Sequence, residues 1–275
     1  MAENGKRVVL VTGASSGLGN ACATYLSKKG YAVYGTSRDP QAAQRKADEF
    51  FELIRMDAED DDSVKLAVDY VLEKEGRIDV LLCNAGMGIA GPVEETPAPE
   101  AARQMDVNFL GAARVVTATL PSMRKTGGTI LVTGSIAGRA GVPFQAYYSA
   151  SKFALEGFVE SLRMELKPFP VRIAIVEPGD FRTGFTAARS TAAVPEGSPY
   201  REAMVRAIGV MEHDEREGSN PIEMARLVYA LLGRKRLRVR YTVGPLFERF
   251  AAGLKRVIPS RWYEAIMASY YRVGT

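Results

Sequence analysis

The sequence predicts an α/β fold, in which a doubly wound parallel sheet of about seven strands has helices on both faces. Short apolar or β-branched segments alternate with longer amphipathic segments along most of the chain. Several of the short segments are apolar throughout, as expected for strands that helices cover on both faces of a parallel sheet. The chain contains no linker-like composition shift, internal repeat or low-complexity tract, so residues 1–275 are predicted to form a single domain.

Seven segments are predicted as strands, and most of the segments between them as crossover helices. The strands are expected at residues 8–11, 32–35, 53–56, 80–83, 129–132, 171–176 and 239–243. Two regions fall outside this alternation. Residues 184–220 are rich in Ala, Gly, Ser and Pro and are expected to cover the substrate site as a lid, and residues 245–275 are expected to form a helical extension.

The composition is that of an ordinary globular chain, 47% hydrophobic and 25% charged, with a net charge of +4. No apolar run approaches the ~18 residues that cross a bilayer, and the N-terminal run is too short for a secretory signal. Two cysteines and no Cys/His spacing argue against a disulfide framework or a metal site. A cytoplasmic location is therefore expected. The basic run RKRLRVR at 234–240 is interpreted as the exposed entrance to a strand, with a nucleic-acid or membrane patch as the alternative. No nucleic-acid partner is expected.

The turn after the first predicted strand, TGASSGLG at 12–19, allows two interpretations. Gly13, Gly17 and Gly19 suit a strand-to-helix turn in which the backbone approaches a pyrophosphate at the helix N-terminus. The same residues match Gly-x-Ser-x-Gly, the nucleophile elbow of serine hydrolases, with Ser15 as nucleophile. That chemistry needs a general base, and the sole histidine, His213, lies in the polar stretch MEHDEREG. The dinucleotide interpretation is therefore favoured.

The end of the second predicted strand indicates which dinucleotide is bound. Folds that prefer NAD place an acid there, roughly 20 residues beyond the last glycine, to bind the ribose 2′-hydroxyl. Ser37 and Arg38 occupy that region, and a guanidinium forms charge-assisted hydrogen bonds with a 2′-phosphate. Asp39 follows directly and could weaken this preference. NADP(H) is expected over NAD(H).

Two adjacent tyrosines precede a lysine in the stretch QAYYSASKFALEGF at 145–158. Residues four apart share a face of a helix, whereas residues five apart lie on nearly opposite faces. Tyr148 and Lys152 can therefore act together if this segment is helical, and Tyr147 and Lys152 cannot. A lone Tyr-x-x-x-Lys is usually a half-buried aromatic beside a solvated lysine, so the pair needs support from the rest of the chain.

That support comes from a series of motifs through which the chain resembles the short-chain dehydrogenase/reductase family. They are TGASSGLG at 12–19, MDAED with Asp57, CNAG with Asn84 to Gly86, DVNFLG with Asn108, VTGSIAG with Ser135, YYSASK with Tyr148, and EPGDFRT with Thr183. The wording of VYGTSRDP, CNAGMGIAGPVEE and SASKFALEGFVESLRMELKPF is most similar to the branch that holds hydroxysteroid and retinol dehydrogenases. The resemblance implies a Rossmann-type fold and an oxidoreductase that interconverts a ketone or aldehyde and its alcohol.

The resemblance also implies a role for each matching residue. Asn108, Ser135, Tyr148 and Lys152 would form the catalytic tetrad. Asp57 would bind the adenine amino group, and Pro178, Gly179 and Thr183 would line the nicotinamide. The full set of expected cofactor contacts is Gly13, Ser15, Ser16, Gly17, Leu18, Gly19, Ser37, Arg38, Asp57, Ala58, Asn84, Ala85, Gly86, Tyr148, Lys152, Pro178, Gly179 and Thr183.

Ketone reduction explains why the tetrad needs these residue types. Hydride transfer develops negative charge on the carbonyl oxygen, which must be hydrogen-bonded and then protonated. A free tyrosine has a pKa of about 10, and Lys152 together with the oxidised nicotinamide is expected to lower the pKa of Tyr148. Ser135 would orient the substrate oxygen, while a proton relay through Asn108 rests on the resemblance alone. The alternative function is an NADP-binding sensor or scaffold of the same fold without turnover.

The predicted substrate is a lipophilic ketone, aldehyde or alcohol, because the side chains expected around the site are mainly apolar. No arginine is expected to hold a substrate carboxylate. The family resemblance further implies a homodimer or homotetramer. The expected substrate contacts are Ser135, Val142, Phe144, Tyr148 and Phe185, with Met87, Met204, Val205 and Ile208 also near the site.

The extension is predicted to contain two amphipathic helices separated by Pro259. The second is expected to begin at Ser260 as N-cap. Packing over the substrate cleft, a subunit contact and docking on a membrane surface are the competing roles. From Gly244 onward five basic residues and two acids give a net +3, which is modest for membrane attachment, so packing on the protein or on a second subunit is favoured. The apolar residues are Leu246, Phe247, Phe250, Leu254, Val257 and Ile258 in the first helix. In the second they are Trp262, Tyr263, Ile266, Met267 and Tyr270, expected on one side.

Overall fold

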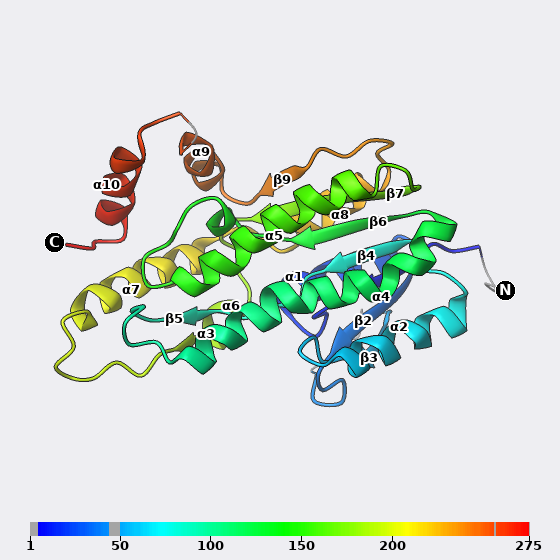
Figure 1. Ribbon diagram of the computed structural model, residues 1–275, viewed down its shortest axis with the longest axis horizontal. Helices are drawn as coiled ribbons and strands as arrows, with labels where there is room; N and C mark the ends of the chain where they lie inside the picture. The colour runs from blue at the N-terminus through cyan, green and yellow to red at the C-terminus, as the bar shows by residue number, and fades with distance from the viewer. Residues whose placement is uncertain (1–4, 44–49, 256, 275) are drawn as a thin grey trace.

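A computed structural model describes residues 5–43, 50–255 and 257–274 and contains the predicted parallel sheet (Figure 1). Within these residues seven strands lie in the order β3-β2-β1-β4-β6-β7-β9, and all neighbouring strands are parallel. Two shorter strands, β5 and β8, pair separately. The bounds are β1 Val8–Val11, β2 Ala32–Ser37, β3 Glu52–Arg55, β4 Val80–Cys83, β5 Ile89–Ala90, β6 Gly128–Thr133, β7 Val171–Pro178, β8 Ser190–Thr191 and β9 Arg240–Val243.

The predicted strands are confirmed, with ends that differ by one or two residues. β2 continues to Ser37 and β7 to Pro178, beyond the last residue of each predicted apolar run. Hydrogen-bonded pairing continues there, with Ser37 opposite Arg55 and Pro178 opposite Val243. Hydrophobicity marks the buried part of a strand, whereas the pairing extends into the carboxyl ends, where the candidate site residues lie.

Helices cover both faces of the sheet. One core contains side chains of α2, α4 and α5, and the other contains side chains of α1 and α8. In β1, Val8 and Leu10 belong to the first core and Val9 and Val11 to the second, which explains why the strand is apolar throughout. The bounds are α1 Gly17–Lys28, α2 Asp61–Glu75, α3 Ala98–Met105, α4 Gly111–Thr126, α5 Ala146–Glu165, α6 Phe185–Ala188, α7 Arg201–Glu217, α8 Ile222–Leu232, α9 Leu246–Leu254 and α10 Ser260–Tyr270.

Local sequence explains the limits of α2. The Asp60 side chain accepts hydrogen bonds from the backbone N–H groups of Asp62 and Ser63, which would otherwise lack partners in the first turn. Gly76 ends the helix with a left-handed φ of 74°, a conformation that costs glycine little. Helix α10 begins without a side-chain cap, and Pro259 occupies its N-cap position. The prediction that Ser260 is the N-cap is therefore wrong, because Ser260 is the first helical residue.

The strand order places a crevice at the carboxyl ends of the sheet. The chain runs from β1 to β2 and β3 on one side and then crosses over to β4 on the other side of β1, and such a reversal of strand order is where open α/β sheets bind ligands. Figure 1 shows α6, α7, α9 and α10 at this end of the molecule, the end toward which the strand arrows point. The two regions that depart from the regular alternation, 184–220 and 245–275, thus both reach the end of the sheet that carries the candidate site.

The two predicted helices of the extension are present, but their apolar residues do not share one side. Tyr263 is buried and Met267 half-buried, whereas Trp262, Ile266 and Tyr270 are 59%, 50% and 39% exposed. Residues four apart follow one stripe of a helix, and the neighbouring residue begins another stripe about 100° away. The body covers the stripe of Tyr263 and Met267, and in the other stripe the Tyr270 hydroxyl contacts the body at Asp214. α9 ends at Leu254, and residue 256, part of the predicted first helix, lies outside the described residues.

The basic run at 234–240 forms the turn between α8 and β9. Leu237 is buried, and Arg240 forms ion pairs with Glu156 and Glu160 of α5. Part of the run therefore packs β9 against the protein, which agrees with the prediction that the run is the entrance to a strand. Across the described ranges, no helix is both long enough and apolar enough to pass through a bilayer.

Candidate active site

The predicted cofactor turn joins β1 to α1 and allows close approach of the backbone. Gly13 and Gly17 have positive φ values of 65° and 58°, a region that favours glycine. At Gly19 a Cβ atom would overlap the carbonyl oxygen of Gly13 and the side-chain amide of Asn84. Ser16 is the N-cap of α1 and makes no side-chain capping bond, so it does not occupy the first N–H groups of the helix. The turn, which also contains half-buried Ser15 and Leu18, fits the pyrophosphate of a dinucleotide.

A buried threonine that was not among the predicted site residues holds this turn against the end of β4. The Thr12 hydroxyl accepts hydrogen bonds from the backbone N–H groups of Asn84 and Ala85, both at 2.9 Å. Asn84 Nδ2 in turn donates to the carbonyl oxygens of Thr12 and Gly13, both at 3.2 Å. The structure therefore brings the predicted Asn84–Ala85 segment directly against the glycine turn. In the sequence, the feature that could have indicated Thr12 is a polar residue at the end of an apolar strand.

The ends of β2 and β3 carry the residues predicted to bind the adenosine half. Ser37 is the last residue of β2, and Arg38 follows it at the surface. The Asp39 carboxylate accepts hydrogen bonds from the backbone N–H groups of Gln41 and Ala42, at 3.1 and 3.0 Å. This carboxylate is thus engaged by its own turn, which reduces the effect that Asp39 was expected to have on an anion near Arg38.

Asp57 and Ala58 follow β3, the strand next to β2. One carboxylate oxygen of Asp57 accepts a hydrogen bond from the Glu59 N–H at 3.0 Å, and Ala58 is buried. A Cβ atom at Gly111, the first residue of α4, would stand 2.9 Å from the Ala58 Cβ. These contacts fix the β3–α2 turn near the start of α4.

Tyr148 and Lys152 lie one turn apart in α5, as the four-residue spacing predicts. The Ser135 side chain lies beside the Tyr148 hydroxyl group and lowers its pKa. Lys152 Nζ lies 5.7 Å from the centre of the Tyr148 ring and donates a 3.0 Å hydrogen bond to the carbonyl oxygen of Thr133. Ser135 follows β6, and its Oγ accepts from the Ala137 N–H at 3.1 Å. Three of the four predicted catalytic residues therefore meet at the carboxyl end of β6.

The ionisation of this group differs from the expectation. Burial above all, with the nearby carboxylates of Asp180 and Glu215, raises the pKa of Tyr148 to about 12, because Ser135 and Arg189 only partly offset these effects. Burial also lowers the pKa of Lys152 to about 8. The chain itself therefore does not provide the predicted lowering of the Tyr148 pKa, because desolvation of the phenol outweighs the groups that lower it, and the Lys152 Nζ is directed to a backbone carbonyl.

Asn108, the fourth predicted catalytic residue, occupies a π-helical segment, Asp106–Leu110, between α3 and α4. It is 1% exposed. Its Oδ1 accepts from the Met87 N–H at 2.8 Å, and its Nδ2 donates to the Met87 carbonyl oxygen and to Ser151 Oγ, both at 3.0 Å. Ser151 Oγ donates to the Tyr148 carbonyl oxygen at 2.7 Å. Asn108 is thus joined to the Tyr148 backbone through one side chain, and π-helical turns are often found at functional sites.

The end of β7 faces the glycine turn. A Cβ atom at Gly17 would lie 3.7 Å from the Thr183 Cβ, so these two predicted cofactor residues meet across the site. Gly179 follows Pro178 and donates from its N–H to the Val243 carbonyl oxygen at 2.8 Å. A Cβ atom at Gly179 would overlap the carboxylate of Glu248 from α9, so a side chain at this position would displace that carboxylate.

A carboxyl pair beside Gly179 was missed in the sequence. Glu248 Oε2 accepts from the Asp180 N–H at 2.8 Å, and the two side chains are also hydrogen-bonded. Burial, then the negative charges of Glu248, Glu215 and Asp214, raise the pKa of Asp180 to about 8. Burial also raises the pKa of Glu248. The pair joins residues 68 positions apart, and no local pattern could have indicated it.

Phe185 contacts the catalytic group from the lid region. Its ring centre lies 5.9 Å from that of Tyr148, and a Cβ atom at Gly88 would stand 2.8 Å from the Phe185 Cζ. Arg189 also lies beside Gly88, but both of its terminal nitrogens bind the Glu215 carboxylate, at 2.8 and 3.2 Å. An arginine is therefore present near the site, yet its charge is already paired.

The remaining predicted substrate residues divide between the site and the surface. Val142 and Phe144 lie in the loop before α5, both half-buried, and Phe144 has a left-handed φ of 58°. The Phe144 carbonyl oxygen accepts from the Gly91 N–H at 2.8 Å. Met204 is buried in α7, but Val205 is 61% exposed. The expectation that Val205 lines the site is therefore wrong, because successive residues of a helix face different directions.

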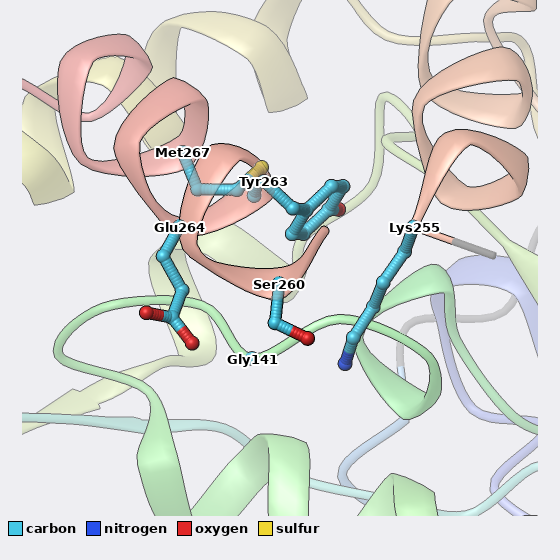
Figure 2. Close-up of a pocket in the computed structure, with 6 residues that line it drawn as sticks. All are labelled: Gly141, Lys255, Ser260, Tyr263, Glu264 and Met267. Carbon is cyan, nitrogen blue, oxygen red and sulfur yellow. The ribbon is translucent and has the colours of Figure 1, made fainter. Parts of the chain in front are cut away.

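A cavity of about 270 Å³ separates the loop before α5 from the C-terminal helices. Figure 2 shows Gly141 on the loop, Lys255 at the end of α9, and Ser260, Tyr263, Glu264 and Met267 from α10 around this space. Lys255 Nζ donates to the Arg139 carbonyl oxygen at 2.8 Å. Gly141 precedes Val142 directly, so this cavity borders the loop that carries two of the predicted substrate contacts.

Comparison with known proteins places the chain among enzymes of one family. The model of the family described as short chain dehydrogenase matches residues 7–193. A 3-ketodihydrosphingosine reductase of Bacteroides thetaiotaomicron is 37% identical over 269 residues, covering 97% of this chain and 98% of that protein. The human 17-beta-hydroxysteroid dehydrogenase type 1 is 41% identical over 193 residues, covering 66% of this chain and 58% of that protein. A crystal structure of a short-chain dehydrogenase from Streptomyces avermitilis matches with a TM-score of 0.82 at 30% identity and 99% coverage of both chains.

These matches favour the dinucleotide interpretation of the glycine turn over the hydrolase interpretation with Ser15 as nucleophile. They also confirm the resemblance to the hydroxysteroid dehydrogenase branch. The seven-stranded sheet, the glycine turn and the Ser135–Tyr148–Lys152 group agree with the same assignment. The chain belongs to the short-chain dehydrogenase/reductase family and is an oxidoreductase that acts on carbonyl or CH–OH groups with a nicotinamide cofactor.

Proposed function

We propose that this protein interconverts a lipophilic ketone or aldehyde and its alcohol with NADP(H), and that Tyr148 is the proton donor and acceptor. The observation that supports this most is that the Ser135 side chain lies close enough to the Tyr148 hydroxyl group to lower its pKa, with buried Lys152 one helical turn away. Both hydroxyl groups can be offered to one carbonyl oxygen, on which negative charge develops during reduction.

NADPH, when bound, supplies the hydride, and the residues of the chain manage the proton and the orientation. With a pKa of about 12, Tyr148 keeps its proton at neutral pH and is ready to donate it to the reduced substrate. Lys152, with a pKa of about 8, gains and loses a proton readily near neutral pH. Asn108 holds the Met87 backbone and Ser151, and through Ser151 it positions the first turns of α5. Asn108 is thus proposed as a positioning residue for Tyr148.

The proposed preference for NADP(H) rests on the end of β2. Arg38 is exposed directly after Ser37, where the family fold places the adenosine ribose, and a guanidinium suits a 2′-phosphate. The Asp39 carboxylate accepts hydrogen bonds from the N–H groups of its own turn, which partly offset its negative charge near this contact.

The proposed lipophilic substrate is supported by the groups that surround Tyr148. Phe185 contacts the tyrosine ring, half-buried Val142 and Phe144 lie in the adjacent loop, and Arg189 is neutralised by Glu215. Arg189 is therefore not available to hold a substrate carboxylate. The relative described as a 3-ketodihydrosphingosine reductase supports a long-chain keto compound as the first candidate.

The test is NADPH consumption with a matched set of carbonyl compounds. We expect turnover with 3-ketodihydrosphingosine or a steroid ketone, and much slower turnover with a keto acid or an aldose. Binding of NADPH without consumption of any of these compounds would support the alternative of a sensor or scaffold. Turnover confined to the keto acid or the aldose would overturn the proposed substrate class.

The assembly and the place of action are part of the same proposal. We propose a single domain over residues 1–275, a homodimer or homotetramer, and a cytoplasmic location. Light scattering of the purified protein measures the oligomeric state, and one cooperative unfolding transition is expected for a single domain.

A further inference from the structure

The C-terminal helices present apolar side chains to solvent. Of the exposed large hydrophobic residues in the described part of the chain, the largest group lies beyond residue 245. The rings of Phe247 and Tyr270 lie 6.1 Å apart and join the stripe of α9 to that of α10. We call this surface the C-terminal apolar face; it consists of Leu246, Phe247 and Phe250 of α9, Val257, and Trp262, Ile266 and Tyr270 of α10.

The opposite side of the two helices is held on the body of the protein. Glu248 accepts the Asp180 N–H, Lys255 donates to the Arg139 carbonyl oxygen, and Tyr263 is 5% exposed. Tyr270, at the edge of the C-terminal apolar face, also reaches the body, because its hydroxyl donates to the Asp214 carboxylate of α7 at 2.7 Å. These contacts fix the orientation of both helices. The apolar residues on their other side are therefore exposed in the packed structure. A contiguous exposed apolar surface of this kind marks an interaction site.

The charges around the face favour an anionic partner. Arg249 and Arg261 are exposed beside the apolar stripes, whereas Glu248, the acid of α9, is turned inward toward Asp180. Glu264 is the exposed acid of α10. A second copy of the chain, docked face to face, would bring the arginines of two identical surfaces together. An anionic lipid surface complements them, and tryptophan, tyrosine and phenylalanine suit the boundary between headgroups and acyl chains.

The position of the face agrees with this partner. Figure 1 shows α9 and α10 at the end of the molecule toward which the strand arrows point, standing out from the sheet. The cavity beneath them borders Gly141, next to the proposed substrate contact Val142 (Figure 2). A lipophilic compound dissolved in a bilayer would therefore reach the proposed cleft beside the docked helices.

We propose that the C-terminal apolar face docks this enzyme on the surface of an anionic lipid bilayer. The apolar side chains enter the interface, and Arg249 and Arg261 lie among the headgroups. This reverses the sequence-based preference for packing on the protein or on a second subunit, because that preference rested on the modest net charge, whereas the structure shows apolar residues of both helices exposed.

The experiment is co-sedimentation of the full-length protein with vesicles of phosphatidylcholine alone and of phosphatidylcholine with about 30% phosphatidylglycerol. The test variant is Leu246→Ser/Phe250→Ser/Trp262→Ser, which changes residues that are 78%, 69% and 59% exposed. The matched control is Leu66→Ser on α2, a leucine that is 70% exposed outside the face. The thermal midpoint and the reduction of a water-soluble ketone confirm that each variant is folded.

We expect the wild type to bind the anionic vesicles at least tenfold more tightly than vesicles of phosphatidylcholine alone. The triple variant should bind the anionic vesicles at least tenfold more weakly than the wild type, and Leu66→Ser should bind them as the wild type does. No binding of the wild type, or equal binding of the triple variant, would overturn the proposal. So would a wild-type oligomer that the triple variant dissociates while vesicle binding is absent, since the face would then be a subunit contact. Sedimentation does not depend on turnover, so failure of the proposed reaction would leave this result interpretable.

Discussion

Replacing Glu248 by Gln should change how the stability of this enzyme depends on pH. The ordinary pKa of an aspartate is about 3.9, and in the folded protein burial and the charges of Glu248, Glu215 and Asp214 raise the pKa of Asp180 to about 8. Between these values the folded state holds a proton that the unfolded chain has released. Stability from this group is therefore complete below the unfolded pKa and is lost as the pH rises through the folded pKa.

The expected size follows from this proton. One proton difference lowers the free energy of unfolding by up to about 1.4 kcal/mol for each pH unit. The Glu248→Gln variant keeps an acceptor for the Asp180 N–H but lacks the negative charge, so the pKa of Asp180 should fall, although burial still raises it. Between pH 7 and 8 we expect the wild type to lose up to about 1 kcal/mol more than the Glu248→Gln variant.

Urea unfolding at pH 6, 7 and 8 measures this difference, with Glu264→Gln as the control that removes an exposed acid of α10. Glu156, whose pKa burial and Glu177 raise to about 7, titrates in the same window in every variant and cancels in the comparison. Identical pH profiles of the wild type and Glu248→Gln, with Glu264→Gln matching both, would refute the assignment of a shared proton to Asp180 and Glu248.

Two further outcomes follow from the site. Replacing Ser37 by Asp and Arg38 by Ala should weaken NADPH binding at least tenfold and improve NADH binding, because a charge-assisted hydrogen bond contributes about 1.5–3 kcal/mol. Nicotinamide fluorescence titrations measure both affinities, and an unchanged preference would exclude Arg38 as the residue that selects NADP(H). Gly19→Ala should weaken binding of either cofactor and destabilise the fold by about 1–3 kcal/mol, since its Cβ would overlap the Gly13 carbonyl. The control Gly157→Ala, on an exposed and open face of α5, should stabilise it by about 0.5–1 kcal/mol; equal effects of the two alanines on unfolding would contradict the close contact.

The features that could be predicted from the sequence are those with a local cause. Apolar runs in β1 and β4 identify strands buried on both faces, and the glycine turn identifies the strand-to-helix connection. The spacing of Tyr148 and Lys152 distinguishes the tyrosine on the lysine's face from its neighbour Tyr147 without any knowledge of the fold. Each of these conclusions depends on residues within one or two turns of each other.

The features that were missed or wrong depend on contacts between distant segments. The Asp180–Glu248 pair joins β7's end to α9, and the pKa of Tyr148 depends on how much protein surrounds its hydroxyl group. In α10, spacing shows two apolar stripes but does not show which one meets the body, so Trp262 was expected beside Tyr263 and lies outside. Tertiary packing decides these questions.

The most direct test of the proposed chemistry compares two adjacent phenol-to-phenyl changes, Tyr148→Phe and Tyr147→Phe, in NADPH consumption with a ketone substrate. Both tyrosines are half-buried in α5, but the Tyr148 hydroxyl is the one whose pKa Ser135 lowers. We predict that Tyr148→Phe lowers turnover by about 10²–10⁴-fold, the usual contribution of a positioned proton donor, while NADPH binding is nearly unchanged and Tyr147→Phe keeps most of its activity. An inactive Tyr147→Phe beside an active Tyr148→Phe would contradict the account.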